Sequence, residues 1–590
     1  MSATRVPLIN KQLEEIRDAI IHAGSVVANA AELDMMFQVL IDGDNTSKVF
    51  RQWWALAREQ DTASSDTTVQ NRYHTLCRWF TLLGKAWAGK YYTLRGPDYT
   101  VNTTGVTTLT PMGELAGRSA AACATELSEN ATDWADEDPM TWYLRFNGLS
   151  LADGTMNVLA VEGVDETFDI SGNTAPVYTG RLALFRRWYT DGTYEYKTFT
   201  TQPETGFTPW AADVAPTTNA HRPMSWQATF GGSKTGTKLT SGSGYEGLNW
   251  TRNGNTPAWR VSAADGLTAA RNWNGYEGTF SDTDLDVILD QWQLRHFDLE
   301  NSGIIEGCLN YNYQYQVAVA ESDVKSVVIT TAQAANLVIG SCVEVGAHAS
   351  GNTDRNTAGM YDLVGCATIL SITEEDIGGT TYARIALDIA SNITVPATAY
   401  ISTMPWVPGS TEHLPGHKDG SLYSVTNGKT PARIAGVELI DGAYAVGLDP
   451  LWSSDWNADR TPKSIYTVYA CPDSEYQASS AGAHHVSVGT FSGPNSGWQY
   501  IKHIAIRTDG MIMPEDAGAA NTSDSKWMKS AFYFNGSSGV RAPWRFCNLT
   551  GGGHGGLAGA YGGAAPSYAL WTGRPRLSGS GKKRGEWAAA

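Results

Sequence analysis

The chain has 590 residues with a net charge of −17 at pH 7, and it contains 61 Gly, 23 Pro, 21 Trp, 26 Tyr and 15 Phe. This length suffices for about three to four domains of about 150 residues, and so many aromatic residues argue against an extensively disordered chain. No apolar run reaches the about 18 residues of a membrane helix, which excludes a membrane protein, and residues 1–15 lack the apolar stretch of a signal sequence, which excludes a secreted disulfide scaffold. The acidic net charge disfavours nonspecific binding to nucleic acid.

Residues 1–90 are predicted to be helical and to serve as an attachment and oligomerisation region. The apolar residues there step by three and four positions, which is the spacing of a heptad seam. They are Ile9, Leu13, Ile16, Ile20, Ala23, Val27 and Ala30. The seam fits either an amphipathic helix packed on its own domain or a short coiled coil between copies of the chain, and from the second reading we expect a homotrimer. Further helices are predicted near residues 47–60 and 69–87.

Residues 91–220 are predicted to form a β-rich domain that ends in a linker. The segments 141–146, 157–161 and 194–199 are rich in β-branched and aromatic residues, which favour strands. Asp191-Gly192 lies between two aromatic runs and predicts a hairpin turn. Residues 203–219 are rich in Pro, Thr and Ala and are predicted to be the linker.

Residues 221–302 and 409–590 are predicted to form one domain that is interrupted by an inserted β domain at 303–408. The interrupted domain is rich in Trp and Gly, with one clear helix at 283–297, where Asp282 and Asp284 can cap the helix and oppose its dipole. The insertion is predicted to be a small β-barrel or β-sandwich. Its strands are expected at 327–329, 337–339, 368–372 and 383–389, with Gly378-Gly379 as a turn. The predicted fold class is therefore α+β and multidomain.

The C-terminal segment combines dense glycine with aromatic anchors. Residues 551–556 and 558–563 are mostly Gly, and residues 541–590 carry seven Lys or Arg against one acidic residue. Gly permits close backbone approach and positive φ, so the segment is predicted to be folded but irregular. The alternative is a flexible low-complexity tail, although regularly spaced aromatic residues are poor linker residues.

No catalytic or metal-binding pattern is found. None of the seven cysteines forms a C-x-x-C pair, which favours mostly buried, reduced thiols. His413 and His417 are four apart, but Pro415 and Gly416 prevent a helix from placing both on one face. Neither a phosphate-binding loop nor a nucleophile elbow is present. We expect no enzyme activity, no metal and no cofactor, while paired carboxylates for glycoside hydrolysis need only be close in space.

Three stretches carry a resemblance to a known family. They are residues 268–272 with the helix that follows, residues 416–421 leading to 431–438, and residues 532–541 followed by the glycine-rich segment and residues 571–577. In this order they resemble the C-type-lectin-like domain of bacteriophage tail proteins. That group is related to the formylglycine-generating-enzyme fold and to the receptor-binding targets of diversity-generating retroelements. The resemblance covers about residues 221–302 and 409–580.

The resemblance implies that the last turns of this domain form a rigid surface that binds a ligand. Aromatic and Arg side chains are common hot-spot residues in such surfaces. Carried onto this sequence, the ligand-binding positions are Trp544, Arg545, Asn548, His554, Tyr561, Tyr568, Trp571 and Arg574. For Trp544 and Trp571 the alternative is that they are core residues that hold the loops in place. The calcium-binding motif of sugar-binding lectins and the paired reactive cysteines of the enzyme branch are both missing from the chain.

The function implied by the resemblance is that of a virion structural protein. The chain would be a tail-fibre or tail-tip protein, made in the cytoplasm of the host bacterium, that binds a glycan or protein receptor on the host cell surface. Its other partners would be further tail proteins and copies of itself, without nucleic acid and without membrane insertion. A tail-associated glycan hydrolase and a purely architectural tail or capsid-decorating protein are the alternatives.

Overall fold

The computed structural model is dominated by short antiparallel strands. Strands make up 42% of the structure, and three α-helices lie among the described residues. The residues that the structure describes are 8–9, 90–97, 106–120, 143–151, 156–162, 167–201, 204–213, 224–247, 249–301, 303–349, 351–414, 428–471, 474–506, 510–519 and 530–579. Among them, no helix combines the length and the apolar composition that crossing a lipid bilayer requires.

The predicted α+β class with a helical N-terminal region is wrong. Leu8–Ile9 forms strand β1, which pairs antiparallel with β5 (Met156–Val161), so Ile9 does not begin a helix. The other helical stretches predicted within residues 1–90 lie outside the described residues. The fold class was missed because the Trp- and Gly-rich region, residues 221–302 and 409–590, forms many strands of two to eight residues. Several of these, such as β22 (Ala432–Ile434), are buried along their whole length and show no alternation of apolar and polar residues.

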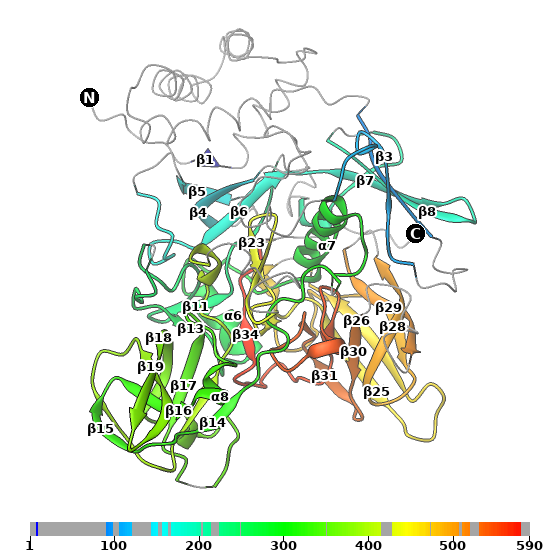
Figure 1. The fold of residues 1–590 in the computed structure, drawn as a ribbon. Coiled ribbons are helices and arrows are strands. Elements are labelled where there is room, and N and C mark those ends of the chain that lie inside the picture. Colours follow the sequence, from blue (N-terminus) through cyan, green and yellow to red (C-terminus); the bar gives the residue numbers. More distant parts are fainter. Residues whose placement is uncertain are drawn as a thin grey trace, which may run out of the picture.

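Two five-stranded sheets occupy the upper part of Figure 1. The first has the order β1-β5-β4-β6-β10, and the second, which we call sheet B, has the order β3-β2-β8-β7-β9. The remaining strands of the first sheet are β4 (Leu144–Ser150), β6 (Val177–Leu182) and β10 (Met224–Ala228). Those of sheet B are β2 (Tyr92–Pro97), β3 (Thr110–Gly113), β7 (Phe185–Thr190), β8 (Tyr194–Thr200) and β9 (Thr208–Pro209). The hairpin predicted at Asp191-Gly192 joins β7 and β8.

The segment predicted to be a linker is folded where the structure describes it. Residues 204–213 contain β9 and a 3-10 turn, η1 (Ala211–Asp213). Trp210 between them is fully buried, and its Nε1 donates a hydrogen bond to Asp290 at 2.7 Å. A buried Trp with a hydrogen-bonded N–H anchors this segment to the core. The Pro- and Thr-rich composition of the segment did not indicate this anchoring.

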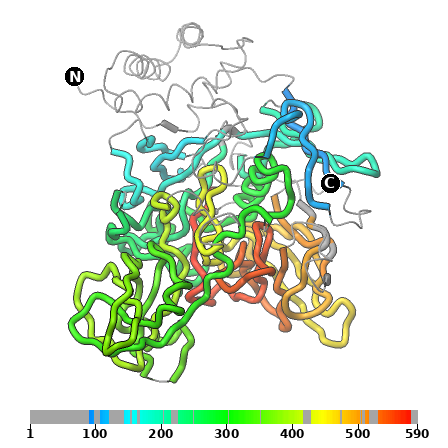
Figure 2. The backbone as a smooth tube through the Cα atoms, viewed as in Figure 1, coloured from blue at the N-terminus to red at the C-terminus, as the bar shows by residue number. Residues whose placement is uncertain are grey.

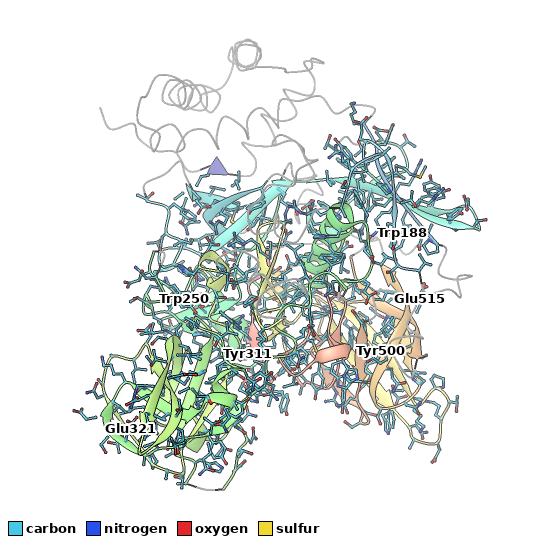
Figure 3. All side chains as sticks on the ribbon, in the orientation of Figure 1. Trp188, Trp250, Tyr311, Glu321, Tyr500 and Glu515 are labelled. Carbon is cyan, nitrogen blue, oxygen red and sulfur yellow. The ribbon has the colours of Figure 1, made fainter. Side chains whose placement is uncertain are left out.

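The inserted module has a hydrophobic core of its own. Its main sheet has the order β14-β21-β17-β18-β19-β16, and β15 pairs with β20. The elements are β14 (Gln314–Gln316), β15 (Glu321–Val324), β16 (Ser326–Thr330), α8 (Thr331–Ala334), β17 (Cys342–Gly346), η2 (Ala358–Met360), β18 (Val364–Ile377), β19 (Thr380–Leu387), β20 (Ile393–Val395) and β21 (Tyr400–Thr403). The strand predicted at 337–339 is wrong, because these residues lie in the loop between α8 and β17. Figure 3 labels Glu321 on the outer part of this module.

The C-terminal region is built on two sheets. The larger has the order β29-β28-β30-β33-β32-β24-β34, and the smaller has the order β27-β26-β25-β31. The strands are β24 (Tyr444–Val446), β25 (Leu451–Trp456), β26 (Ser464–Ala470), β27 (Val486–Gly493), β28 (Gly497–Ile506), β29 (Ile512–Ala519), β30 (Ala531–Phe534), β31 (Gly539–Arg541), β32 (Trp544–Arg545), β33 (Ala560–Tyr561) and β34 (Gly573–Pro575). In Figure 2 the module, in green, and these sheets, in yellow to red, form the two lower parts of the molecule.

Small elements connect these parts. A three-stranded sheet is formed by β11 (Gly232–Thr235), β12 (Lys238–Ser241) and β13 (Thr256–Pro257), and β22 pairs with β23 (Val437–Leu439). Helix α6 (Ala263–Arg271) begins at Ser262, whose side chain accepts a hydrogen bond from the Asp265 N–H. Two further 3-10 turns are η3 (Ser410–Glu412) and η4 (Ser474–Tyr476).

Helix α7 (Asp282–His296) lies at the centre of the molecule and is the helix that the sequence predicts at 283–297. It begins with a capping box between Ser281 and Asp284, and all of its 15 residues are buried. The last described residues are fixed to this start, since Ser578 Oγ donates to Asp284 Oδ2 at 2.7 Å. The N-terminus of α7 is thus joined directly to the end of the described chain.

An ionic cluster on α7 attaches sheet B to the core. We use this name for Arg186 of β7, Lys197 of β8, and Asp286 and Asp290 of α7. Arg186 donates to both Asp286 oxygens at 2.6 and 2.7 Å and to Asp290 at 2.8 Å. Lys197 donates to Asp290 at 2.6 Å. Buried charges are tolerated when they are paired and hydrogen-bonded, so this cluster allows the polar side of α7 to be buried.

Candidate functional site

The larger C-terminal sheet separates a core face from a face lined with partly exposed aromatic rings. Strand β30 shows this alternation: Phe532 and Phe534 are fully buried, whereas Tyr533 between them is half-buried. Successive strand residues point to opposite faces of a sheet. Tyr533 therefore lies on the face opposite to the central core.

Four aromatic residues from four neighbouring strands lie side by side on this second face. The strand register places Trp498 opposite Tyr533, Tyr533 opposite Tyr561, and Tyr561 opposite Trp544. The ring centroids are 5.5, 4.7 and 5.9 Å apart along this series. Directly opposed residues share one face of a sheet, so the four residues form a continuous ladder, which we call the aromatic row.

Further aromatic side chains cover both ends of the aromatic row. At one end the His554 ring is stacked on Trp498 with centroids 5.1 Å apart, and it lies 5.5 Å from Tyr500, which Figure 3 labels. At the other end Tyr568 is stacked on Trp544 at 5.9 Å. Trp544 is fully buried, whereas Tyr568 is 44% exposed. The accessible surface therefore extends from His554 over the middle of the row to Tyr568.

The glycine-rich segment is held in place by hydrogen bonds. The N–H of Gly552 donates to Leu309 O at 2.9 Å, and that of Gly562 donates to Tyr533 O at 3.0 Å. A 3-10 turn, η6 (Gly552–His554), positions the His554 ring. A Cβ at Gly563 would lie 2.7 Å from the Tyr561 hydroxyl oxygen, so glycine at this position leaves the Tyr561 ring undisturbed.

The predicted site residue Arg545 lies beneath the aromatic row, on the core face. Its Nε and Nη2 bind the two carboxylate oxygens of Asp282 at 2.7 and 2.5 Å, and its guanidinium lies 5.3 Å from the Trp452 ring centroid. Arg545 is 1% exposed. It supports the sheet from below, and a ligand at the surface does not reach it.

The remaining predicted residues lie away from the row. Arg574 is buried, pairs with Asp441 and donates to Trp406 O at 3.0 Å. Trp571 lies against the inserted module, where the Arg355 guanidinium is 4.3 Å from its ring centroid. Asn548 accepts hydrogen bonds from the N–H and hydroxyl of Thr550. Of the eight predicted residues, the structure brings together Trp544, His554, Tyr561 and Tyr568.

Sequence reasoning missed Trp498, Tyr500 and Tyr533. The spacing of Trp498 and Tyr500 by two residues is the local signal that both lie on one face of a strand. The Phe-Tyr-Phe pattern at 532–534 is a similar signal, because a Tyr between two buried Phe points to the other face. Neither pattern shows which strands are neighbours.

The aromatic row offers neutral ring faces with hydroxyl and imidazole groups between them. Burial raises the pKa of Tyr561 and of Tyr500, and burial lowers the pKa of His554. These side chains are therefore uncharged near pH 7. Such a surface can stack on a sugar ring or an apolar group and can hydrogen-bond its polar substituents.

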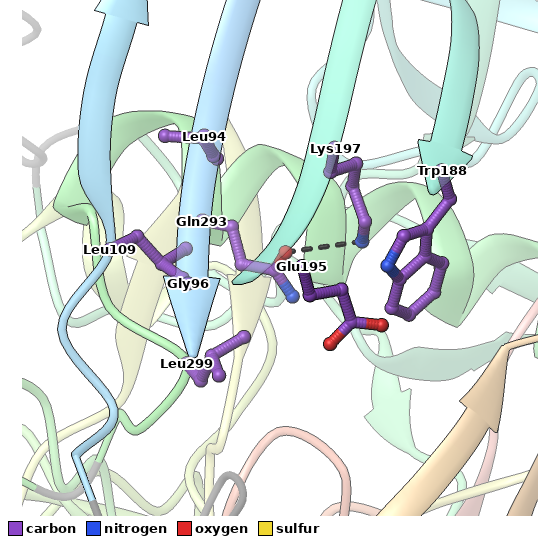
Figure 4. A pocket seen from close by; sticks show the side chains of 8 residues that line it. All are labelled: Leu94, Gly96, Leu109, Trp188, Glu195, Lys197, Gln293 and Leu299. Carbon is purple, nitrogen blue, oxygen red and sulfur yellow. Dashed lines mark hydrogen bonds between the residues drawn. The ribbon is translucent and has the colours of Figure 1, made fainter. Parts of the chain in front are cut away.

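A second hollow, between sheet B and α7, is a weaker candidate. Figure 4 shows that Lys197 in this hollow is hydrogen-bonded to Gln293, at 3.1 Å, and that Trp188 lies beside it. Lys197 Nζ also lies 4.4 Å from the Trp188 ring centroid and pairs with Asp290. The lysine is thus occupied by its protein partners, and the rest of the lining is mostly apolar.

No protein-family model and no curated protein matches the chain. Within the described part of the chain, no group of three or more His, Cys, Asp or Glu side chains lies close enough together to hold a metal ion. The geometry of the aromatic row is therefore the main guide to function.

Proposed function

We propose that this protein is a non-enzymatic structural protein of a bacteriophage tail and that it binds a glycan of the host cell surface through the aromatic row. The aromatic row is the observation that carries the binding part of the proposal. The order of the three family-like stretches in the sequence supports the assignment to a phage virion. Other tail proteins and copies of the same chain are the proposed virion partners.

The chemistry of the row favours an uncharged glycan. Tyr and Trp faces present large apolar areas and lose little conformational entropy on binding, because each side chain has few rotatable bonds. The packing of Tyr533 between Trp498 and Tyr561 fixes these rings before the ligand arrives, and this preorganisation lowers the entropic cost of binding. A homotrimer would present three such rows, and avidity would then raise the affinity by orders of magnitude.

The proposal is tested by binding of the full chain to a panel of immobilised bacterial polysaccharides, namely lipopolysaccharide O-antigens, capsular polysaccharides and peptidoglycan. The variant Trp498→Ala/Tyr561→Ala removes two adjacent rings of the row. If each ring contributes at least about 1 kcal/mol, as is common for binding hot spots, the double variant binds about 30-fold more weakly. Tyr189→Ala is the matched control, because Tyr189 is 41% exposed but lies on β7 in sheet B.

Four outcomes would overturn the proposal. Equal binding by the double variant would remove the aromatic row from the site, and equal loss in Tyr189→Ala would show an unspecific effect. Release of oligosaccharides from a bound polysaccharide would instead support a glycan hydrolase. Absence of binding to the panel and to whole bacterial cells, together with assembly into virions, would support an architectural protein.

A further inference from the structure

Two neighbouring strands of the inserted module place two cysteines against each other. Cys342 is the first residue of β17 and is paired with Thr368 of β18, and Cys366 lies two positions before Thr368, where the register of the two strands shifts. The two Sγ atoms are 3.1 Å apart, and both residues are free thiols. Since a disulfide bond is about 2.05 Å long, a relative movement of about 1 Å would allow the bond to form.

The surroundings distinguish the two thiols. Cys342 is fully buried, whereas Cys366 is partly exposed. The Arg252 guanidinium donates a hydrogen bond to Cys366 Sγ, and its other nitrogen donates to Asn255 O at 2.8 Å. A guanidinium beside the sulfur of a partly exposed cysteine is the type of environment in which reactive cysteines are found.

The acidities of the two thiols follow from these contacts. Burial acts to raise the pKa of Cys366, but the hydrogen bond from Cys342 and the charge of Arg252 outweigh it and lower this pKa to about 7. Burial raises the pKa of Cys342 well above its usual value. Near neutral pH, Cys366 is therefore partly a thiolate and can attack, while Cys342 keeps its proton until a later step.

We propose that Cys342 and Cys366 are a redox-active pair that forms an intramolecular disulfide by exchange with a small disulfide such as oxidised glutathione. The Cys366 thiolate attacks one sulfur of glutathione disulfide, which forms a mixed disulfide and expels one glutathione thiolate. Cys342 then loses its proton to water and attacks Cys366 Sγ, which expels the second glutathione thiolate. The pair loses two protons and two electrons, and glutathione disulfide is reduced to two thiols.

The bond would form where the module meets the rest of the chain. Cys342 packs in a cluster with Tyr245 and Trp259, which precede the module in sequence, and with Met404 and Val407, which follow its last strand. Oxidation also removes the thiolate that Arg252 contacts. The redox state of the cysteine pair therefore affects the contacts at the junction between the module and the Trp- and Gly-rich region.

The test uses the full chain, reduced, desalted and incubated with oxidised glutathione at pH 7.5. We expect the number of thiols titrated after denaturation to fall from the seven of the sequence to five. Arg355 lies between the two cysteines, so trypsin separates them into peptides 326–355 and 356–384. Mass spectrometry should find these two peptides joined by one disulfide and no glutathione adduct on either.

Variants separate the roles of the two thiols. Cys366→Ser should lose no thiol to the oxidant, whereas Cys342→Ser should lose one and carry glutathione on peptide 356–384. Arg252→Gln should react several-fold more slowly at pH 7, because less Cys366 is ionised. Cys547→Ala is the control, since Cys547 is buried in the C-terminal region, and it should still form the crosslinked peptide pair. Retention of all seven thiols by the natural sequence, or a crosslink between other cysteines, would overturn the proposal.

Discussion

The ionic cluster predicts that Asp290→Ala severely weakens the attachment of sheet B to α7. Asp290 accepts three hydrogen bonds, from Lys197 at 2.6 Å, from Trp210 at 2.7 Å and from Arg186 at 2.8 Å. Its removal leaves Asp286 as the only carboxylate of the cluster, and Arg186 already binds both of its oxygens. Breaking a buried ion pair in this way costs about 3–5 kcal/mol.

Hydrogen exchange measures this cost locally. Peptides that contain β7 and β8 should exchange their protected amides about two to four orders of magnitude faster in Asp290→Ala, since each 1.4 kcal/mol corresponds to a factor of ten. Asp455→Ala is the matched control, because Asp455 pairs with Arg460 while its side chain is 69% exposed, and such a pair contributes less than about 1 kcal/mol. An acceleration below about fivefold in sheet B of Asp290→Ala would refute the reasoning.

Three further predictions follow from the aromatic row and the cysteine pair. Gly563→Ala should displace the Tyr561 ring and weaken polysaccharide binding, whereas Gly482→Ala, where an added Cβ meets no atom within 4 Å, should bind as the natural sequence does. Burial lowers the pKa of His554, so below pH 6.5 the unfolded state binds more protons than the folded state and acid destabilises the fold. The melting temperature should therefore fall more between pH 7.5 and 5.5 in the natural sequence than in His554→Gln. An equal fall in both proteins would contradict this. Oxidation of the cysteine pair closes a loop of about 25 residues, and the chain-entropy model gives a gain of about 3.5 kcal/mol, so amide exchange in β17 should slow by about two orders of magnitude on oxidation and stay unchanged in Cys366→Ser.

Local signals in the sequence predicted some elements well. Helix α7 was indicated by its apolar spacing and by the acidic residues at its start, and the β7–β8 hairpin was indicated by Asp191-Gly192. Both depend on contacts between residues close together in the chain. The strands of the Trp- and Gly-rich region were missed because they are short, and because strands buried on both faces show no period of two.

The candidate site was predicted only in part, because its geometry depends on strand pairing over long distances. His554, Tyr561 and Tyr568 could be proposed as candidates because they lie in or just after the glycine-rich segment 551–563. Trp498 joins them only through the register of β28, β30 and β33. Arg545 was expected at the surface, but its carboxylate partner is 263 positions away in the sequence, and no local pattern shows such a pairing.

The position of β34 has a consequence for the order in which the protein can be assembled. This strand pairs in parallel with β24, and Gly579, four residues further on, donates to the Asp284 carboxylate at 3.1 Å. During translation, the first turn of α7 leaves the ribosome almost 300 residues before these partners. The nascent chain must therefore keep its central helix incompletely buried until synthesis is nearly finished, and a chain that stops before residue 573 would lack the segment that closes the core.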